Sequence, residues 1–160
     1  MHSQTKEYLL RMGQQEKRFD ALYRSAASAF GFPDCSMWIL YYLAMEGKPL
    51  AQHDLIDRMM FPKQTIHSAV AWLSKQGWVS LETNPASRRS KDILLTDAGR
   101  KAAQDTVEKL LSAEAQAVEH MGKEKMDHYI ALHEELLSLL RLSFAEEQLI
   151  DTPDAQPNSK

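Results

Sequence analysis

The sequence has 160 residues, of which 44% are hydrophobic and 26% are charged, with a formal net charge of -3. This length suits one globular domain with a sizeable core. The single cysteine excludes an internal disulfide, as expected for a protein of the reducing cytoplasm. Because the total charge is acidic, the composition excludes an evenly basic DNA-binding surface, and any DNA contact must come from a local group of cations.

The first residues of the sequence lack the apolar core of a signal peptide. The longest apolar run, residues 37–45, is well short of the roughly 20 residues that span a bilayer. We therefore predict a cytoplasmic protein that makes no contact with a membrane.

Two helices are predicted in the N-terminal third of the chain. The first runs from about residue 5 to residue 30 and stops near Gly31-Phe32-Pro33, and the second spans about residues 36–46. The extended pair Lys48-Pro49 then separates them from a short third helix. The apolar face of that helix comprises Leu50, Leu55, Ile56 and Met59.

The next helix, beginning beside Phe61-Pro62, has one apolar face and one polar face. Its inward stripe, spaced i, i+3, i+4 and i+7, comprises Ile66, Ala69, Val70 and Leu73. Its outward face comprises Gln64, Ser68, Ala71 and Lys75, with Thr65 and His67 on the shoulders. This outward face contains no carboxylate, so it can approach phosphates and base edges. Joined at Met60-Phe61, the two short helices form a helix-turn-helix unit.

A β-hairpin is predicted after Gly77, whose position suits a left-handed helix stop. Residues 79–83 alternate as a half-buried strand does, and a second strand is predicted over residues 92–95. The segment between them, residues 84–91, combines turn formers with Arg88, Arg89 and Lys91, and we predict a loop that straddles a DNA backbone or enters a minor groove. The predicted fold is therefore mainly α with a small β-hairpin wing, a winged helix-turn-helix over about residues 36–96.

Two further helices follow the wing. Thr96 can cap a helix that reaches His120 and stops at Gly122, and the last helix spans residues 123–144. The apolar stripe of the last helix comprises Met126, Tyr129, Ile130, His133, Leu136, Leu137, Leu140 and Phe144. This stripe either closes a monomer core or forms a dimer interface. Residues 146–160 contain little apolar material and are predicted to be disordered.

Over residues 14–144 the chain resembles the MarR family of bacterial transcriptional regulators. The most specific segments are PKQTIHSAVAWLSKQGWVSL at 62–81 and SRRSKDILLTDAGR at 87–100, which resemble that family's recognition helix and its wing leading into Leu-Thr-x-x-Gly. Arg89 matches the family's wing arginine, whereas Ser87 replaces the acidic residue usual two positions earlier. The resemblance implies a single domain over residues 1–145, in which dimerisation helices at about 5–30 and 97–144 interlace two subunits.

The same resemblance implies a homodimeric, sequence-specific regulator of transcription, a repressor that binds double-stranded DNA. Its two recognition helices are expected to lie about 34 Å apart on a pseudo-palindromic operator. The predicted DNA-contacting residues are Lys63, Gln64, Thr65, His67, Ser68, Lys75, Arg88, Arg89 and Lys91. The acidic total charge and Ser87 leave open an alternative, a winged-helix module that binds a protein and no DNA.

Two features could sense a signal. A cluster of aromatic residues could line a crevice for a small aromatic effector such as a phenol, or it could pack in the core. That cluster comprises Tyr23, Trp38, Tyr41 and Tyr42. Cys35, at the predicted start of a helix, could be oxidised because a helix dipole lowers a thiol pKa, or it could be a half-buried packing residue.

No group of residues indicates catalysis, a metal or a cofactor. His128 and His133 lie five positions apart rather than at the i, i+4 spacing of paired ligands on a helix. The sequence contains no glycine-rich phosphate loop, nucleophile elbow or CxxC pair. We therefore predict a protein that is not an enzyme and that binds neither a metal nor a cofactor.

Overall fold

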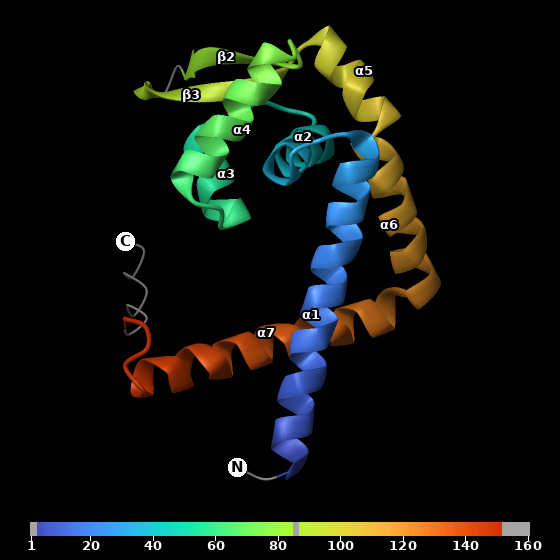
Figure 1. Ribbon diagram of the computed structural model, residues 1–160, viewed down its shortest axis with the longest axis vertical. Coiled ribbons are helices and arrows are strands. Elements are labelled where there is room, and N and C mark those ends of the chain that lie inside the picture. Colours follow the sequence, from blue (N-terminus) through green and yellow to red (C-terminus); the bar gives the residue numbers. More distant parts are fainter. Residues whose placement is uncertain (1–2, 85–86, 152–160) are drawn as a thin grey trace. The chain divides into compact units, whose positions relative to one another are not determined.

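The computed structural model describes residues 3–84 and 87–151, and it leaves the side chains of residues 84 and 87–90 undescribed. These residues fold into two compact units divided after Ala113. Most of the described chain is helical, with one three-stranded antiparallel sheet in the first unit (Figure 1). The predicted fold class, mainly α with a small β-hairpin wing, is confirmed. The single domain predicted over residues 1–145 stays a prediction.

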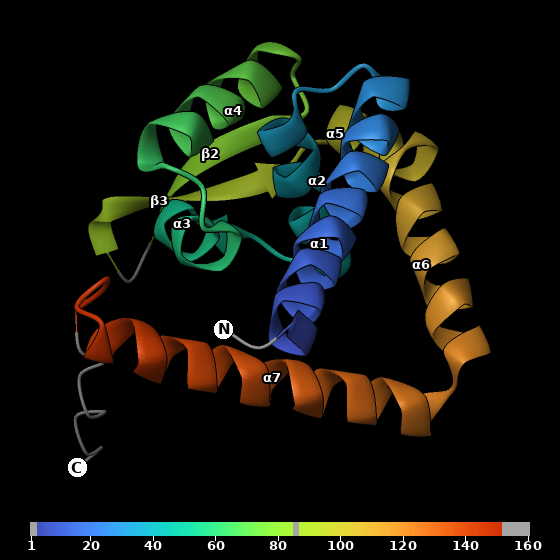
Figure 2. The same cartoon turned by 60° about the horizontal axis from the view of Figure 1, so that its bottom comes forward.

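In the first unit, α1 (Ser3–Phe30) and α2 (Asp34–Glu46) follow the predicted helices closely. α1 ends at Gly31, which adopts a left-handed φ of 72°, and the Phe32 amide donates to the Ala27 carbonyl at 2.9 Å. α2 is buried along most of its length and packs against α1, α4 (Lys63–Lys75) and α5 (Asp97–Asp105). Figures 1 and 2 both show α2 between α1 and the pair formed by α3 (Gln52–Met59) and α4. It is therefore the central helix of this unit.

The sheet has the order β1-β3-β2, from β1 (Leu50–Ala51), β2 (Val79–Asn84) and β3 (Ser87–Leu95). Sequence periodicity predicted β2 but missed β1, which is only two residues long. The predicted loop over residues 84–91 was wrong, because β3 begins at Ser87, which pairs with Asn84 of β2 after a register irregularity beyond Thr83. The outer part of this hairpin is polar, so it has no alternation for a sequence reading to detect. The two residues between the strands, 85 and 86, lie outside the described part.

A core of α2, helix-turn-helix and sheet side chains fixes the orientation of α4. Ile66, Ala69, Val70 and Leu73 are all buried, as the helical spacing predicted. They pack in one cluster with buried residues of α2, α3 and the sheet: Ile39, Leu43, Leu50, Leu55, Val79 and Ile93. Because the apolar side of α4 is held in this way, its polar side must face outward.

The predicted helix from Thr96 to His120 is instead two helices, α5 and α6 (Val107–Met121). Thr106 interrupts them with φ -132° and ψ -90°, and its hydroxyl donates to the Ala102 carbonyl at 2.5 Å. A threonine hydroxyl bonded to the carbonyl four residues back favours a helix bend. The next residue, Val107, is fully buried, so the change of direction places it in the core.

The second unit contains the end of α6 and all of α7 (Lys123–Glu146), which are separated by Gly122 with a left-handed φ of 80°. α7 closes with a turn in which the Leu149 amide donates to the Phe144 carbonyl at 2.8 Å. Of the tail predicted to be disordered, residues 147–151 form this turn, and residues 152–160 lie outside the described part. Within the described residues, no helix is both long enough and apolar enough to cross a membrane.

Thr96 and Gly99 join the wing, the end of α4 and the start of α5. The Thr96 hydroxyl accepts from the Gly99 amide at 3.0 Å and donates to the Gly77 carbonyl at 2.6 Å. The Thr96 amide donates to the Trp78 carbonyl at 3.1 Å. A Cβ atom at Gly99 would lie 1.8 Å from that same carbonyl oxygen, so the backbones touch directly. This contact, the Thr96–Gly99 junction, explains physically why a Leu-Thr-x-x-Gly segment follows the wing.

Replacing Gly99 with alanine should lower the free energy of unfolding by about 1–3 kcal/mol, because a methyl group there forces two backbone segments apart. Urea denaturation followed by circular dichroism measures this loss. Gly13→Ala is the matched control, since a Cβ at Gly13 meets nothing within 4 Å and alanine favours the α1 helix. Equal stability of both variants and the wild type would disprove the tight junction.

Candidate nucleic-acid interface

The helix-turn-helix is built from α3, a tight turn and α4. The turn is made by Met60, a non-glycine residue with a left-handed φ of 53°. α4 begins directly after Pro62, as predicted, and the Pro62 carbonyl accepts from the Thr65 amide at 2.8 Å. A proline at this position loses no helical hydrogen bond, so the local sequence itself defines where α4 starts.

All the predicted DNA-contacting residues of α4 are exposed and lie on its outward side. We call this set the reading face, and it comprises Lys63, Gln64, Thr65, His67, Ser68 and Lys75. α4 contains no acidic residue, and Lys63 stands in its first turn, where free backbone amides already favour an anion. The face therefore offers cations and hydrogen-bonding groups with no charge to repel a phosphate.

One residue of the reading face is bonded to the neighbouring helix. The Nδ1 atom of His67 lies 2.6 Å from the Nε2 atom of Gln52, the first residue of α3. Sequence reasoning missed this contact because the two residues are 15 positions apart and each belongs to a different helix. The imidazole is thus held at one edge of the reading face.

The wing is less uniformly cationic than the sequence suggested. Lys91 is exposed, whereas the side chains of Arg88 and Arg89 lie outside the described part. Further along the hairpin, Glu82 and Asp92 face each other as cross-strand partners. Like charges at opposed positions of two strands are unfavourable, so this pair adds no attraction for a phosphate. The strand register brings them together, and their positions in the sequence give no sign of it.

The structure joins the four predicted ligand-binding aromatics into one chain of ring contacts. Ring centroids are 4.9 Å apart for Tyr23 and Trp38, 5.3 Å for Trp38 and Tyr41, and 5.8 Å for Tyr41 and Tyr42. Tyr41 is buried in the core, as the packing alternative predicted. Tyr23 and Trp38 also line a surface hollow of about 460 Å³. Tyr41 therefore belongs to the core, whereas Tyr23 and Trp38 are accessible from the hollow.

Five other residues line this hollow, which we call the aromatic hollow, and sequence reasoning missed all of them. They come from α1, the start of α2 and the helix-turn-helix turn: Phe19, Asp20, Arg24, Asp34 and Phe61. No short motif unites such distant segments. Two carboxylates accompany one guanidinium here, so the charge disfavours an anion. One oxygen of Asp34 is buried without a hydrogen-bond partner among the described residues.

Cys35 does not have the lowered pKa that its place at a helix start suggested. Burial, together with the negative charge of Asp34, raises the pKa of the thiol to about 11. The side chain is only 6% exposed and packs in the core with Ile39 and Leu43. Loss of hydration outweighs the helix dipole because the thiolate would have to form in an apolar site. The packing alternative for Cys35 describes the structure.

The Cys35 thiol should react slowly with iodoacetamide in the native protein at pH 7.5. Since its pKa is about 11 rather than the ordinary value of 9.0, the thiolate fraction is about 100-fold lower than in the unfolded chain. The reaction should speed up as the pH rises towards 11. Mass spectrometry of native and urea-unfolded protein gives both rates. Comparable rates at pH 7.5 would show a reactive thiol and restore the oxidation hypothesis.

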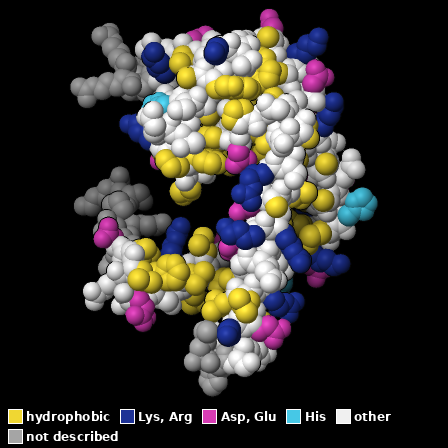
Figure 3. All heavy atoms as spheres, viewed as in Figure 1, with side chains coloured by type: hydrophobic (Ala, Val, Ile, Leu, Met, Phe, Trp, Pro, Cys, Tyr) yellow, Lys and Arg dark blue, Asp and Glu magenta, His cyan; other side chains and the backbone are white. Residues whose placement is uncertain are grey.

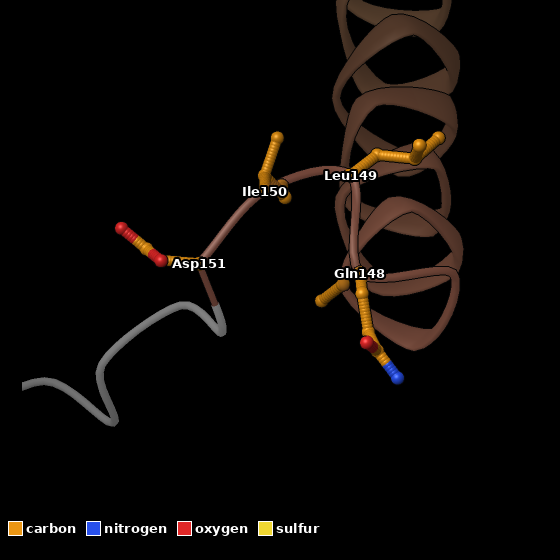
Figure 4. Close-up of a pocket in the computed structure, with 5 residues that line it drawn as sticks. Gln148, Leu149, Ile150 and Asp151 are labelled. Carbon is orange, nitrogen blue, oxygen red and sulfur yellow. The ribbon is translucent and has the colours of Figure 1, made fainter.

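A second hollow, at the end of α7, brings no chemical groups together. It is lined by Ala145, Gln148, Leu149, Ile150 and Asp151. The labelled side chains fan outward from the turn instead of converging (Figure 4). Among the described residues, no group of three or more histidine, cysteine or acidic side chains could hold a metal ion. The reading face and the aromatic hollow are therefore the two candidate sites.

The fold and the reading face define the class of the protein. A helix-turn-helix whose second helix leads into a two-stranded hairpin is a winged helix-turn-helix. The comparison with family models agrees, since residues 30–90 match the model described as MarR family. That segment contains the helix-turn-helix and most of the wing. The comparison with curated proteins found no match.

Three solved structures share the fold. NMB1585, a MarR family regulator from Neisseria meningitidis, has a TM-score of 0.75 and 19% identity over 88% of this chain and 98% of its own. Sco3205 from Streptomyces coelicolor, a MarR family transcriptional regulator in complex with DNA, has a TM-score of 0.64 and 21% identity over 86% of this chain and 88% of its own. NadR in complex with 4-hydroxyphenylacetate has a TM-score of 0.64 and 22% identity over 79% of this chain and 89% of its own. Residues 30–90 are thus similar to the MarR family, and the wider chain shares the fold of these structures, each of which is less than 25% identical to it.

Proposed function

We propose that the protein is a homodimeric repressor of transcription that reads a pseudo-palindromic DNA operator with α4 and the β2–β3 wing. The observation that carries the proposal is the reading face, which has two lysines and four polar side chains but no carboxylate. The major groove of B-DNA admits an α-helix, so α4 can present this face to base edges. Sco3205, which has the same fold, has been determined in complex with DNA and gives further support.

Replacing Lys63 or Lys75 with alanine should weaken binding to an operator selected from a random-sequence library. Each lost phosphate contact should reduce the slope of log affinity against log salt by about 0.9. Fluorescence anisotropy at several salt concentrations measures affinity and slope together. Lys125→Ala is the matched control, because Lys125 is an exposed lysine of α7, away from the reading face in the sequence. If the wild type selects no site and binds DNA only weakly, so that random competitor DNA abolishes the binding, the protein-interaction module is favoured instead.

The support for a homodimer is the apolar surface of α7. None of its residues is buried, and the larger apolar ones, Tyr129, Ile130, Leu132, Leu137, Leu139, Leu142 and Phe144, are 44% to 57% exposed. Apolar side chains gather along this helix in Figure 3. A soluble monomer rarely leaves so long an apolar surface in water. We infer that a second copy of the chain covers it, as the resemblance to the MarR family implies.

The variant Leu137→Glu should shift the protein towards monomers and raise the dimer dissociation constant at least about 100-fold. An unpaired carboxylate buried at the interface costs several kcal/mol, and a two-fold axis introduces it twice. Sedimentation velocity over a range of concentrations measures the shift. Ser138→Glu adds the same charge at an exposed polar position about 100° around α7 from Leu137 and should leave the dimer intact. Unchanged association of both variants would place the interface elsewhere.

We propose that a small aromatic molecule entering the aromatic hollow modulates operator binding. The raised pKa of Cys35 supports a ligand over oxidation as the signal. A neutral phenol suits the hollow best, because its ring can stack on Tyr23 or Trp38 while its hydroxyl donates to one of the lining carboxylates. NadR, of the same fold, has been determined with 4-hydroxyphenylacetate. Such a ligand would weaken operator binding by its preference for the form that does not bind DNA.

A further inference from the structure

The contact between Gln52 and His67 determines what the reading face can offer at one of its edges. An amide nitrogen can donate a hydrogen bond but cannot accept one. Nε2 of Gln52 lies 2.6 Å from Nδ1 of His67, and in this orientation of the amide the ring nitrogen accepts and the imidazole proton is assigned to Nε2. His67 then carries a single N–H donor on the ring nitrogen that does not face Gln52.

The position of His67 on α4 explains why this residue meets α3. At about 100° per residue, Gln64, Ser68 and Lys75 share the centre of the outward side, and His67 lies about 60° to one side of Gln64. Thr65 lies on the opposite shoulder. Among the described residues of the reading face, His67 alone is hydrogen-bonded to a side chain of another element. Its ring is therefore oriented before DNA arrives, whereas long exposed side chains such as Lys63 must be ordered on binding.

We propose that Gln52 is a positioning residue that presents the Nε2–H group of His67 to a purine base in the major groove. A fixed donor suits N7 or O6 of guanine, or N7 of adenine. The inference rests on the proposed function, in which α4 enters that groove. Gln52 itself need not touch DNA. Its contribution is to restrict rotation of the imidazole and the choice of its tautomer, which turns a flexible polar group into a directional reader.

The test compares DNA sites selected from a random-sequence library by the wild type, Gln52→Ala and His67→Ala. We expect the wild type to prefer a purine at one base pair of each half-site, and both variants to lose that same preference. Affinity of the dimer for the wild-type operator should fall about tenfold to 100-fold in each variant, because a hydrogen bond that contributes about three- to tenfold is lost in each of the two half-sites. Affinity for random DNA and the salt slope should not change, because the phosphate contacts remain. A merely structural role of Gln52 would weaken both kinds of binding.

A double-mutant cycle isolates the pair. Adding Gln52→Ala to His67→Ala should cause no further loss of operator affinity, whereas Gln52→Ala and Gln64→Ala should act additively. Gln52→Met keeps the side-chain length without the donor and should behave as Gln52→Ala does. If Gln52→Ala keeps the wild-type affinity and base preference while the wild type binds its operator, the inference fails and the proposed function stands. If the wild type selects no site, both are overturned.

Discussion

The architecture of the first unit depends on the direct contact between Gly99 and the Trp78 carbonyl. The Trp78 carbonyl that Gly99 touches also accepts a hydrogen bond from the Thr96 amide. The Thr96 hydroxyl donates to the carbonyl of Gly77, in the turn that follows α4. One short segment thus determines where α4 ends, where β3 ends and where α5 begins. Any side chain at Gly99 would separate these three elements, and a hydroxyl at residue 96 satisfies both an amide and a carbonyl that the chain reversal leaves unpaired.

The reading face follows from this packing, because α4 is oriented by what it buries. Ile66, Val70 and Leu73 are enclosed between α2 and the sheet, so the helix cannot rotate without exposing them. Its polar residues are left on the outside by the same constraint. The bond from Gln52 to His67 adds a second constraint, which acts on one side chain instead of the whole helix. Burial of apolar side chains thus orients α4 as a whole, whereas a hydrogen bond orients the side chain of His67.

Sequence reasoning predicted the features that local patterns encode. The spacing of Ile66, Ala69, Val70 and Leu73 gave the buried side of α4, and Gly31, Gly77 and Gly122 gave helix ends. It failed where tertiary packing decides. The break at Thr106 depends on burying Val107, and the length of β3 depends on backbone pairing of polar residues. For the sites, exposure of the reading face was predictable, but the Gln52–His67 bond and the aromatic hollow unite residues from separate elements that no short pattern connects.

The acidic total charge is compatible with DNA recognition because the charges are separated along the chain. Residues 107–151 contain ten carboxylates and four cations, whereas residues 62–91 contain five cations and one carboxylate. A DNA helix attracts the second segment and repels the first, so only orientations that present α4 and the wing gain from the phosphate field. The two acidic residues of the hairpin, Glu82 and Asp92, are cross-strand partners and add no attraction to that field. If α4 reads DNA as proposed, weak non-specific attraction makes the protein depend more on base contacts, and a pre-oriented side chain such as His67 then contributes more to specificity than another lysine.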